Sequence, residues 1–187
     1  KLHAKPITLA CACHIYHTIY TLCTTEQYDP YLVATTSLYL AGKVEEDHLR
    51  LRDVINVCYS TLHPDRPPLD IGKTYWSLRE TVVHCELFIM RLLQFKVSFD
   101  HPHRHLLHFI KSVQDLLTPQ VVARSPIATT AWALLRDSYH GNICLHHSPE
   151  HLAVCCLYLA LEMLGVEVPL NNQGEATWWN VSSPLIL

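Results

Sequence analysis

Leu38-Tyr39-Leu40-Ala41 recurs as Leu157-Tyr158-Leu159-Ala160, displaced by 119 residues from position 38 to position 157. The surroundings of the two tetrapeptides also correspond, because Asp29-Pro30 precedes the first copy where Ser148-Pro149 precedes the second. Self-similarity at a fixed displacement is the sequence signature of a repeated structural unit. The chain is therefore predicted to contain two copies of one unit.

Helix-start signals occupy corresponding places in both copies. Lys5-Pro6-Ile7-Thr8 matches Ser125-Pro126-Ile127-Ala128 at nearly the same displacement. Asp29, Ser125 and Ser148 each precede a proline, and an N-cap residue followed by proline is typical of a helix start. No segment keeps the alternation of a strand. We expect an all-α chain with helices at about 6–23, 30–46, 50–60, 72–96, 102–117, 125–140, 148–164 and from 177 onward.

Two helices are expected to form the centres of the repeated units. Those over 30–46 and 148–164 are apolar on most faces and carry small residues, which let neighbouring backbones approach closely. Gly141 and Gly165 follow apolar periodic runs, where a left-handed residue commonly ends a helix. Each unit is therefore predicted to have a central, buried hub helix.

The two units are predicted to cover residues 1–98 and 99–187, and neither copy is complete. The first-copy counterpart of the helix over 102–117 would lie before the first residue. Counterparts of the helices over 50–60 and 72–96 would extend past the last residue, to about 215. Because the sequence also begins without an initiator methionine, we expect it to be a fragment in which the first unit lacks its opening helix and the second is truncated.

Charge and hydropathy narrow the function classes. The chain has 187 residues, with 14 Lys and Arg against 17 Asp and Glu and a net charge of −3. Because no basic cluster is present to neutralise a phosphate backbone, this argues against nucleic acid as the principal partner. The longest apolar stretch, 152–161, is about half of the ~20 residues that span a bilayer, so we expect no membrane segment and no signal peptide.

Cysteine and glycine usage points to an intracellular chain without a catalytic site. The eight cysteines lack the regular spacing of a disulfide framework, and several lie in apolar helical segments, so we interpret them as buried free thiols in a reducing compartment. The five glycines form no phosphate-binding loop, and neither a nucleophile elbow nor a spaced acid pair is present. We expect a protein that is not an enzyme and carries no cofactor.

Only the first hub helix ends in a lysine followed by acidic residues. The first copy continues Gly42-Lys43-Val44-Glu45-Glu46, where the second reads Leu161-Glu162-Met163-Leu164. By the ordinary interpretation, Lys43 complements the helix dipole and extends its ammonium into water. Glu86 favours a further role, because it interrupts an apolar stripe of the helix expected over 72–96. A partly buried carboxylate needs hydrogen-bond donors, which either Lys43 or backbone N–H groups of a partner would supply.

These residues resemble a known family. The segment Leu32 to Glu46, which reads LVATTSLYLAGKVEE, resembles the cyclin-box signature, in which an apolar third helix ends in Lys-x-Glu-Glu. Cys85-Glu86-Leu87, followed by Leu92-Leu93-Gln94-Phe95, resembles the glutamate-containing fifth helix of that box. Two cyclin boxes in tandem would also account for the duplication. Similarity to the cyclin Q branch of the family rests on the segments 53–57, 101–103, 130–141 and 165–169.

The resemblance implies a regulatory subunit that binds and activates a cyclin-dependent serine/threonine kinase, with a role in cell-cycle or transcription regulation and a place in the nucleus. It also implies that Lys43 and Glu86 bind the kinase αC helix, whose position controls activation of the kinase. A lysine donates to main-chain carbonyls and a carboxylate accepts from N–H groups, so this pair suits main-chain recognition. Glu45 and Glu46 either join the contact or are solvated residues at a helix end. Similarity to cyclin Q implies cyclin-dependent kinase ten as the partner.

Two other functions compete with this one. A TFIIB-type transcription factor also uses tandem cyclin-like repeats, to bind polymerase and DNA, but it needs a basic face that the charge balance does not favour. A metal-dependent helical enzyme rests on His101, His105 and His108, which share a helical face. Because His101 lies at the helix start and no carboxylate completes the set, we expect these histidines to serve packing or the surface, without a metal site.

Overall fold

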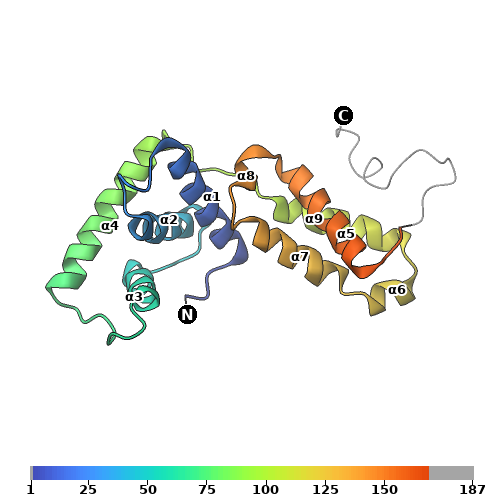
Figure 1. Cartoon of the computed structure of the whole chain (residues 1–187), viewed down its shortest axis with the longest axis horizontal. Coiled ribbons are helices and arrows are strands. Elements are labelled where there is room, and N and C mark those ends of the chain that lie inside the picture. The colour runs from blue at the N-terminus through green and yellow to red at the C-terminus, as the bar shows by residue number, and fades with distance from the viewer. Residues whose placement is uncertain (1, 169–187) are drawn as a thin grey trace. The chain divides into compact units, whose positions relative to one another are not determined.

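Within residues 2–168, which the computed structural model describes, every regular element is a helix (Figure 1). The expected all-α class is confirmed. None of these helices is both long and apolar enough to cross a bilayer. The helices are α1 Pro6–Leu22, α2 Pro30–Val44, α3 Leu51–Leu62, α4 Lys73–Leu92, α5 Pro102–Leu116, α6 Pro119–Arg124, α7 Ile127–Ser138, α8 Ile143–His146 and α9 Pro149–Leu164.

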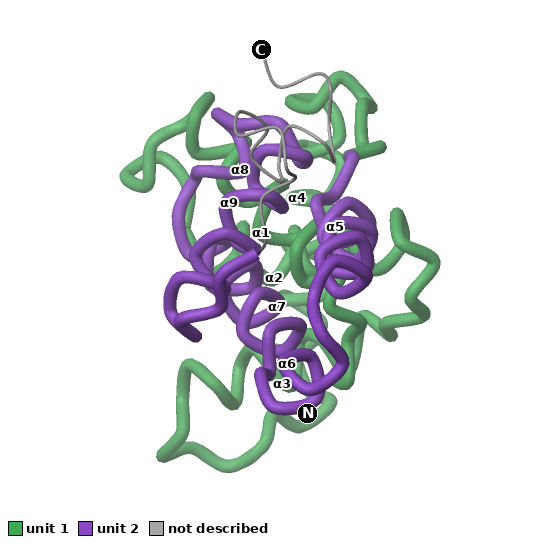
Figure 2. Tube along the Cα trace, turned by 90° about the vertical axis from the view of Figure 1, so that its right-hand side faces the viewer, with its two compact units in different colours: residues 1–99 green, residues 100–187 purple. Residues whose placement is uncertain are grey.

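The chain divides into two compact units, residues 1–99 and residues 100–187, which Figure 2 shows in different colours. In the first unit, α2 packs against α1, α3 and α4, so it is the hub helix that was predicted. It begins where expected, because the Asp29 carboxylate accepts from the Leu32 N–H at 2.9 Å and Pro30 needs no acceptor at the first helical position. The core around it is built from Ile15, Ile19, Val33, Leu40 and Ile89.

In the second unit, α9 packs against α5 and α7. The Ser148 hydroxyl accepts from the His151 N–H at 3.3 Å at its start, and Gly165 takes a left-handed conformation (φ 62°) at its end. The hub prediction holds on the face that carries fully buried Leu157 and Ala160. It is wrong for the opposite face, where Leu159 is 50% exposed, so α9 is less enclosed than predicted.

Several boundaries differ from the predictions for local reasons. Ser125 is not the N-cap of a helix: it is the C-cap of α6, where its N–H donates to the Val121 carbonyl at 2.9 Å, and α7 begins at Ile127 with Pro126 as its N-cap. The short helices α6 and α8 were not predicted. Among the described glycines, Gly165 alone has a positive φ, so Gly141 does not end a helix in the predicted way. The helix expected from 177 onward lies outside the described residues.

The fourth helix ends at Leu92 rather than at 96 as predicted. Gln94 and Phe95 take left-handed conformations, with φ of 51° and 60°, and the Phe95 N–H donates back to the Met90 carbonyl at 2.9 Å. A backbone reversal of this kind usually uses glycine. Because no glycine occupies this turn, the sequence carries no signal for the end of α4.

One histidine of α5 is expected to make the second unit sensitive to pH. The His103 ring lies 5.2 Å from the Trp132 ring and 6.1 Å from the Tyr139 ring, between centroids. Burial, with a smaller contribution from His101, lowers the pKa of His103 from 6.5 to about 4. Its Nδ1 is buried without a hydrogen-bond partner among the described residues. The neutral ring is thus the form that fits this site.

Because the folded-state pKa of His103 lies below its unfolded value, its contribution to stability is complete above pH 6.5 and is lost as the pH falls toward 4. We expect the free energy of unfolding to drop by roughly 1–2 kcal/mol between pH 7 and pH 5, a figure reduced for the partial exposure of the ring. Urea unfolding at both pH values measures it. His103→Phe should remove this dependence and exposed His108→Gln should keep it; equal pH dependence in both variants would contradict the assignment.

Candidate functional site

Lys43 and Glu86 meet at one end of the first unit. Lys43 lies in the last turn of α2 and Glu86 lies on α4, and the ammonium Nζ donates to Glu86 Oε1 at 2.5 Å. The lysine side chain is 49% exposed and the glutamate side chain 14%. The predicted proximity of the two residues is confirmed.

Helix packing brings this pair together. Val82, Cys85 and Ile89 of α4 are buried, and Cys85 and Ile89 belong to the same core cluster as Leu40 of α2. Residues three and four apart share a helix face, so Glu86 stands at the edge of this buried stripe, where α4 meets the end of α2. The apolar stripe therefore fixes the carboxylate, and the last turn of α2 supplies the lysine.

Tyr39 completes the surroundings of the lysine. The Lys43 Nζ lies 4.4 Å from the centroid of the Tyr39 ring, one helical turn earlier. Burial alone would lower the pKa of Lys43, but the hydrogen bond and negative charge of Glu86, with a smaller effect of Tyr39, raise it above its ordinary value. The ammonium therefore stays charged at physiological pH. Sequence reasoning missed Tyr39, although its spacing of four residues from Lys43 was a usable signal.

The two neighbouring glutamates point to different surroundings. Glu45 is half-buried beside Cys11 of α1, and burial together with the charge and hydrogen bonding of Glu45 raises the pKa of that thiol to about 12. Glu46 is exposed and takes a left-handed conformation with φ of 50°. The structure therefore brings Lys43 and Glu86 into contact, places Glu45 beside Cys11 and leaves Glu46 exposed just after the end of α2.

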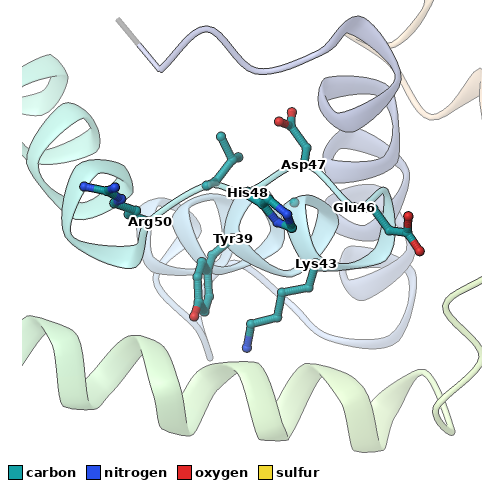
Figure 3. Close-up of a pocket in the computed structure, with 8 residues that line it drawn as sticks. Tyr39, Lys43, Glu46, Asp47, His48 and Arg50 are labelled. Carbon is teal, nitrogen blue, oxygen red and sulfur yellow. The ribbon is translucent and has the colours of Figure 1, made fainter.

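A pocket opens beside the lysine, where the chain turns from α2 toward α3. Figure 3 shows the Lys43 side chain extending toward α4, whereas the Glu46 side chain extends in another direction, to the right of the view. The pocket carries charged groups of both signs, from Lys43 and Arg50 and from Glu46 and Asp47. It is lined by Tyr39, Gly42, Lys43, Glu46, Asp47, His48, Leu49 and Arg50.

The three histidines considered for metal binding face different groups. His101 is buried, with Nδ1 3.3 Å from the Tyr139 hydroxyl. His105 lies with Nε2 3.4 Å from Asp100 and Nδ1 3.9 Å from Glu150. His108 is exposed. Nδ1 of His101 and both ring nitrogens of His105 thus lie near separate groups of their own unit.

All eight cysteines are free thiols, but their burial varies. Cys11, Cys85 and Cys156 are buried as expected, whereas Cys155 is exposed. Burial, with a contribution from Cys155, raises the pKa of Cys156 to about 11. The prediction of burial is therefore wrong for Cys155, because it lies on the uncovered face of α9.

Comparison with known proteins identifies the family. The sequence profile described as "Cyclin, N-terminal domain" matches residues 1–98. Similar curated proteins include Cyclin-T1-4 of Arabidopsis thaliana, with 29% identity over 183 residues, 96% of this chain and 32% of that protein. Cyclin-T2 of Homo sapiens is 27% identical over 188 residues, 100% of this chain and 24% of that protein. Cyclin-T1 of Mus musculus is 28% identical over 189 residues, 100% of this chain and 25% of that protein.

The chain thus spans about a quarter to a third of the length of these relatives. The profile match covers more than half of the chain and includes both Lys43 and Glu86. The helical first unit, with its buried central helix, agrees with that match. On this match the chain belongs to the cyclin family.

Proposed function

We propose that this chain is a regulatory subunit that binds and activates a cyclin-dependent serine/threonine kinase and acts in the nucleus in transcription regulation. The observation that carries the proposal is the charged pair of Lys43 and Glu86 at the end of the hub helix of a cyclin N-terminal domain. The relatives named Cyclin-T support the cyclin class. The chain acts by positioning the kinase, and the kinase performs the phosphoryl transfer.

The pair is suited to hold a main-chain segment. An ammonium has three N–H donors, and the contact with Glu86 occupies one of them, so Lys43 retains donors for partner carbonyls. The Glu86 carboxylate has further lone pairs that accept from partner N–H groups. Because both recognise backbone atoms, they fix where a kinase helix lies without selecting its side chains. A kinase αC helix held inward keeps the Lys–Glu pair of the kinase formed, as phosphoryl transfer requires.

Only the first unit is proposed to bind the kinase. Tyr39 and Lys43 have counterparts in Tyr158 and Glu162, at the same spacing of four residues. The charge and hydrogen bonding of Glu162 raise the pKa of Tyr158, so a carboxylate occupies the place of the ammonium. An interface built around a lysine donor would meet the opposite charge in the second unit.

The identity of the kinase is proposed from sequence resemblance, and the choice between Glu45 and Glu46 as a contact residue from their exposure. The segments similar to cyclin Q support cyclin-dependent kinase ten as the partner, and mass spectrometry of proteins that co-purify with the full-length chain tests that assignment. Of the two neighbouring glutamates, Glu46 is the better candidate for direct contact, because it is exposed whereas Glu45 lies against Cys11.

The first test compares the corresponding residues of the two units. Lys43→Ala should weaken binding of cyclin-dependent kinase ten by about 2–5 kcal/mol, the range for truncating a charged donor at a desolvated interface. Glu162→Ala should weaken it far less. Isothermal titration calorimetry measures both, with thermal melting to confirm that each variant is folded. Equal losses from the two substitutions, or none from Lys43→Ala, would refute a one-sided interface.

The second test changes the carboxylate alone. Glu86→Gln keeps the side-chain length and one oxygen acceptor but removes the charge, so it should weaken kinase binding by about 1.5–3 kcal/mol. Because Lys43 is half exposed, the same change should lower the stability of the free chain by less than about 1 kcal/mol. Isothermal titration calorimetry with the kinase and urea unfolding of the free chain give the two quantities. Unchanged kinase binding by the variant would remove Glu86 from the interface.

A further inference from the structure

The two hub helices end with the same backbone reversal but with different residues at its critical position. In the second unit, the Val166 N–H donates to the Leu161 carbonyl at 3.0 Å, and left-handed Gly165 lies between them. In the first unit, the Asp47 N–H donates to the Gly42 carbonyl at 2.8 Å, and Glu46 takes the left-handed conformation. Glycine adopts that conformation without steric penalty, whereas glutamate does not. The end of α2 that carries Lys43 is therefore strained.

A carboxylate beside the strained residue anchors this turn to another helix. Asp47 Oδ2 accepts from the Lys5 N–H and from the Thr8 hydroxyl, each at 2.9 Å, and the Thr8 side chain is fully buried. Lys5 is the N-cap of α1 and makes no side-chain capping hydrogen bond, and the first turn of α1 has no acidic residue. Asp47 thus caps α1 from the end of α2.

The turn that carries Asp47 packs closely on the end of α2. A Cβ atom placed on Gly42 would lie 3.1 Å from the Asp47 carbonyl oxygen and 3.1 Å from the Leu49 side chain, so the turn packs directly on the last turn of α2. Figure 3 shows the Asp47 carboxylate on the side of this turn opposite to the Lys43 ammonium. Asp47 therefore acts on the lysine through the backbone of the turn rather than by contact with its side chain.

We infer that Asp47 is a positioning residue for kinase binding: by tying the turn to the start of α1 it holds Glu46 in its left-handed conformation and keeps Lys43 beside Glu86. This inference rests on the proposed function. Preorganisation of a binding group improves affinity because less freedom is lost on association. The hydrogen bonds from Lys5 and then Thr8 also lower the pKa of Asp47, so the anchoring carboxylate stays ionised at neutral pH.

The test is a double-mutant cycle between the anchor and the strained residue. Asp47→Ala should weaken binding of cyclin-dependent kinase ten by about tenfold. In the E46G background, where glycine adopts the left-handed conformation unaided, the same change should weaken binding by no more than about twofold. Each effect is measured relative to its own background, so a direct contact made by Glu46 cancels. Asp47→Asn should keep most of the affinity, because the amide oxygen still accepts both hydrogen bonds.

Asp65→Ala, an exposed acidic residue in the loop before α4, is the matched control and should leave binding unchanged. Thermal melting of every variant checks the fold. Hydrogen exchange of the Glu45 and Asp47 amides should accelerate when Asp47→Ala is made in the chain that keeps Glu46, but not when it is made together with E46G. Unchanged binding by Asp47→Ala, or the same loss in both backgrounds, would overturn the positioning role. If Lys43→Ala also leaves binding unchanged, both the proposed kinase-binding site and the positioning role of Asp47 are refuted. If Lys43→Ala weakens binding and only the double-mutant cycle gives the contrary result, the kinase-binding site stands and the positioning role alone is refuted.

Discussion

Burial of α2 between α1 and α4 is the constraint on which the first unit depends. Fully buried side chains such as Ile19, Val33 and Ile89 contribute about 1.5–3 kcal/mol each when removed from water. A half-exposed ion pair such as Lys43 with Glu86 contributes about 0–1 kcal/mol. Apolar packing therefore brings these two residues together across 43 positions of sequence, and their attraction is a consequence of the fold rather than its cause. The pair remains available for another task.

The local chemistry of the sequence predicted the larger elements well. Asp29 and Ser148 cap the helices that they were expected to cap, because a side-chain acceptor followed by proline acts within one turn. Ser125 carried the same signal but serves as the C-cap of α6, and Pro126 takes the N-cap position of α7 in its place. The helices α6 and α8 have six and four residues, too few for a periodic apolar stripe to be recognised.

The candidate site was predictable where it follows a helical pattern and not where it depends on distant contacts. An interrupted apolar stripe identified Glu86, and the charged end of the repeated helix identified Lys43. Asp47 meets its partners across 42 and 39 positions of sequence, and no periodicity connects them. The left-handed conformation of Glu46 was equally hidden, because a sequence marks such a position only when it carries glycine. The hydrogen bonds of Asp47 and the positive φ of Glu46 are seen only in the three-dimensional structure.

The uncovered face of α9 gives the chain thiols of very different reactivity. The thiolate is the form that attacks alkylating reagents, and burial suppresses it at Cys11 and Cys156, whose pKa values are raised to about 12 and about 11. Cys155, which directly precedes Cys156 in α9, is exposed. A maleimide fluorophore applied briefly at neutral pH therefore labels α9 ahead of these buried sites. The second unit thus carries a built-in attachment point for an optical probe, with no cysteine introduced.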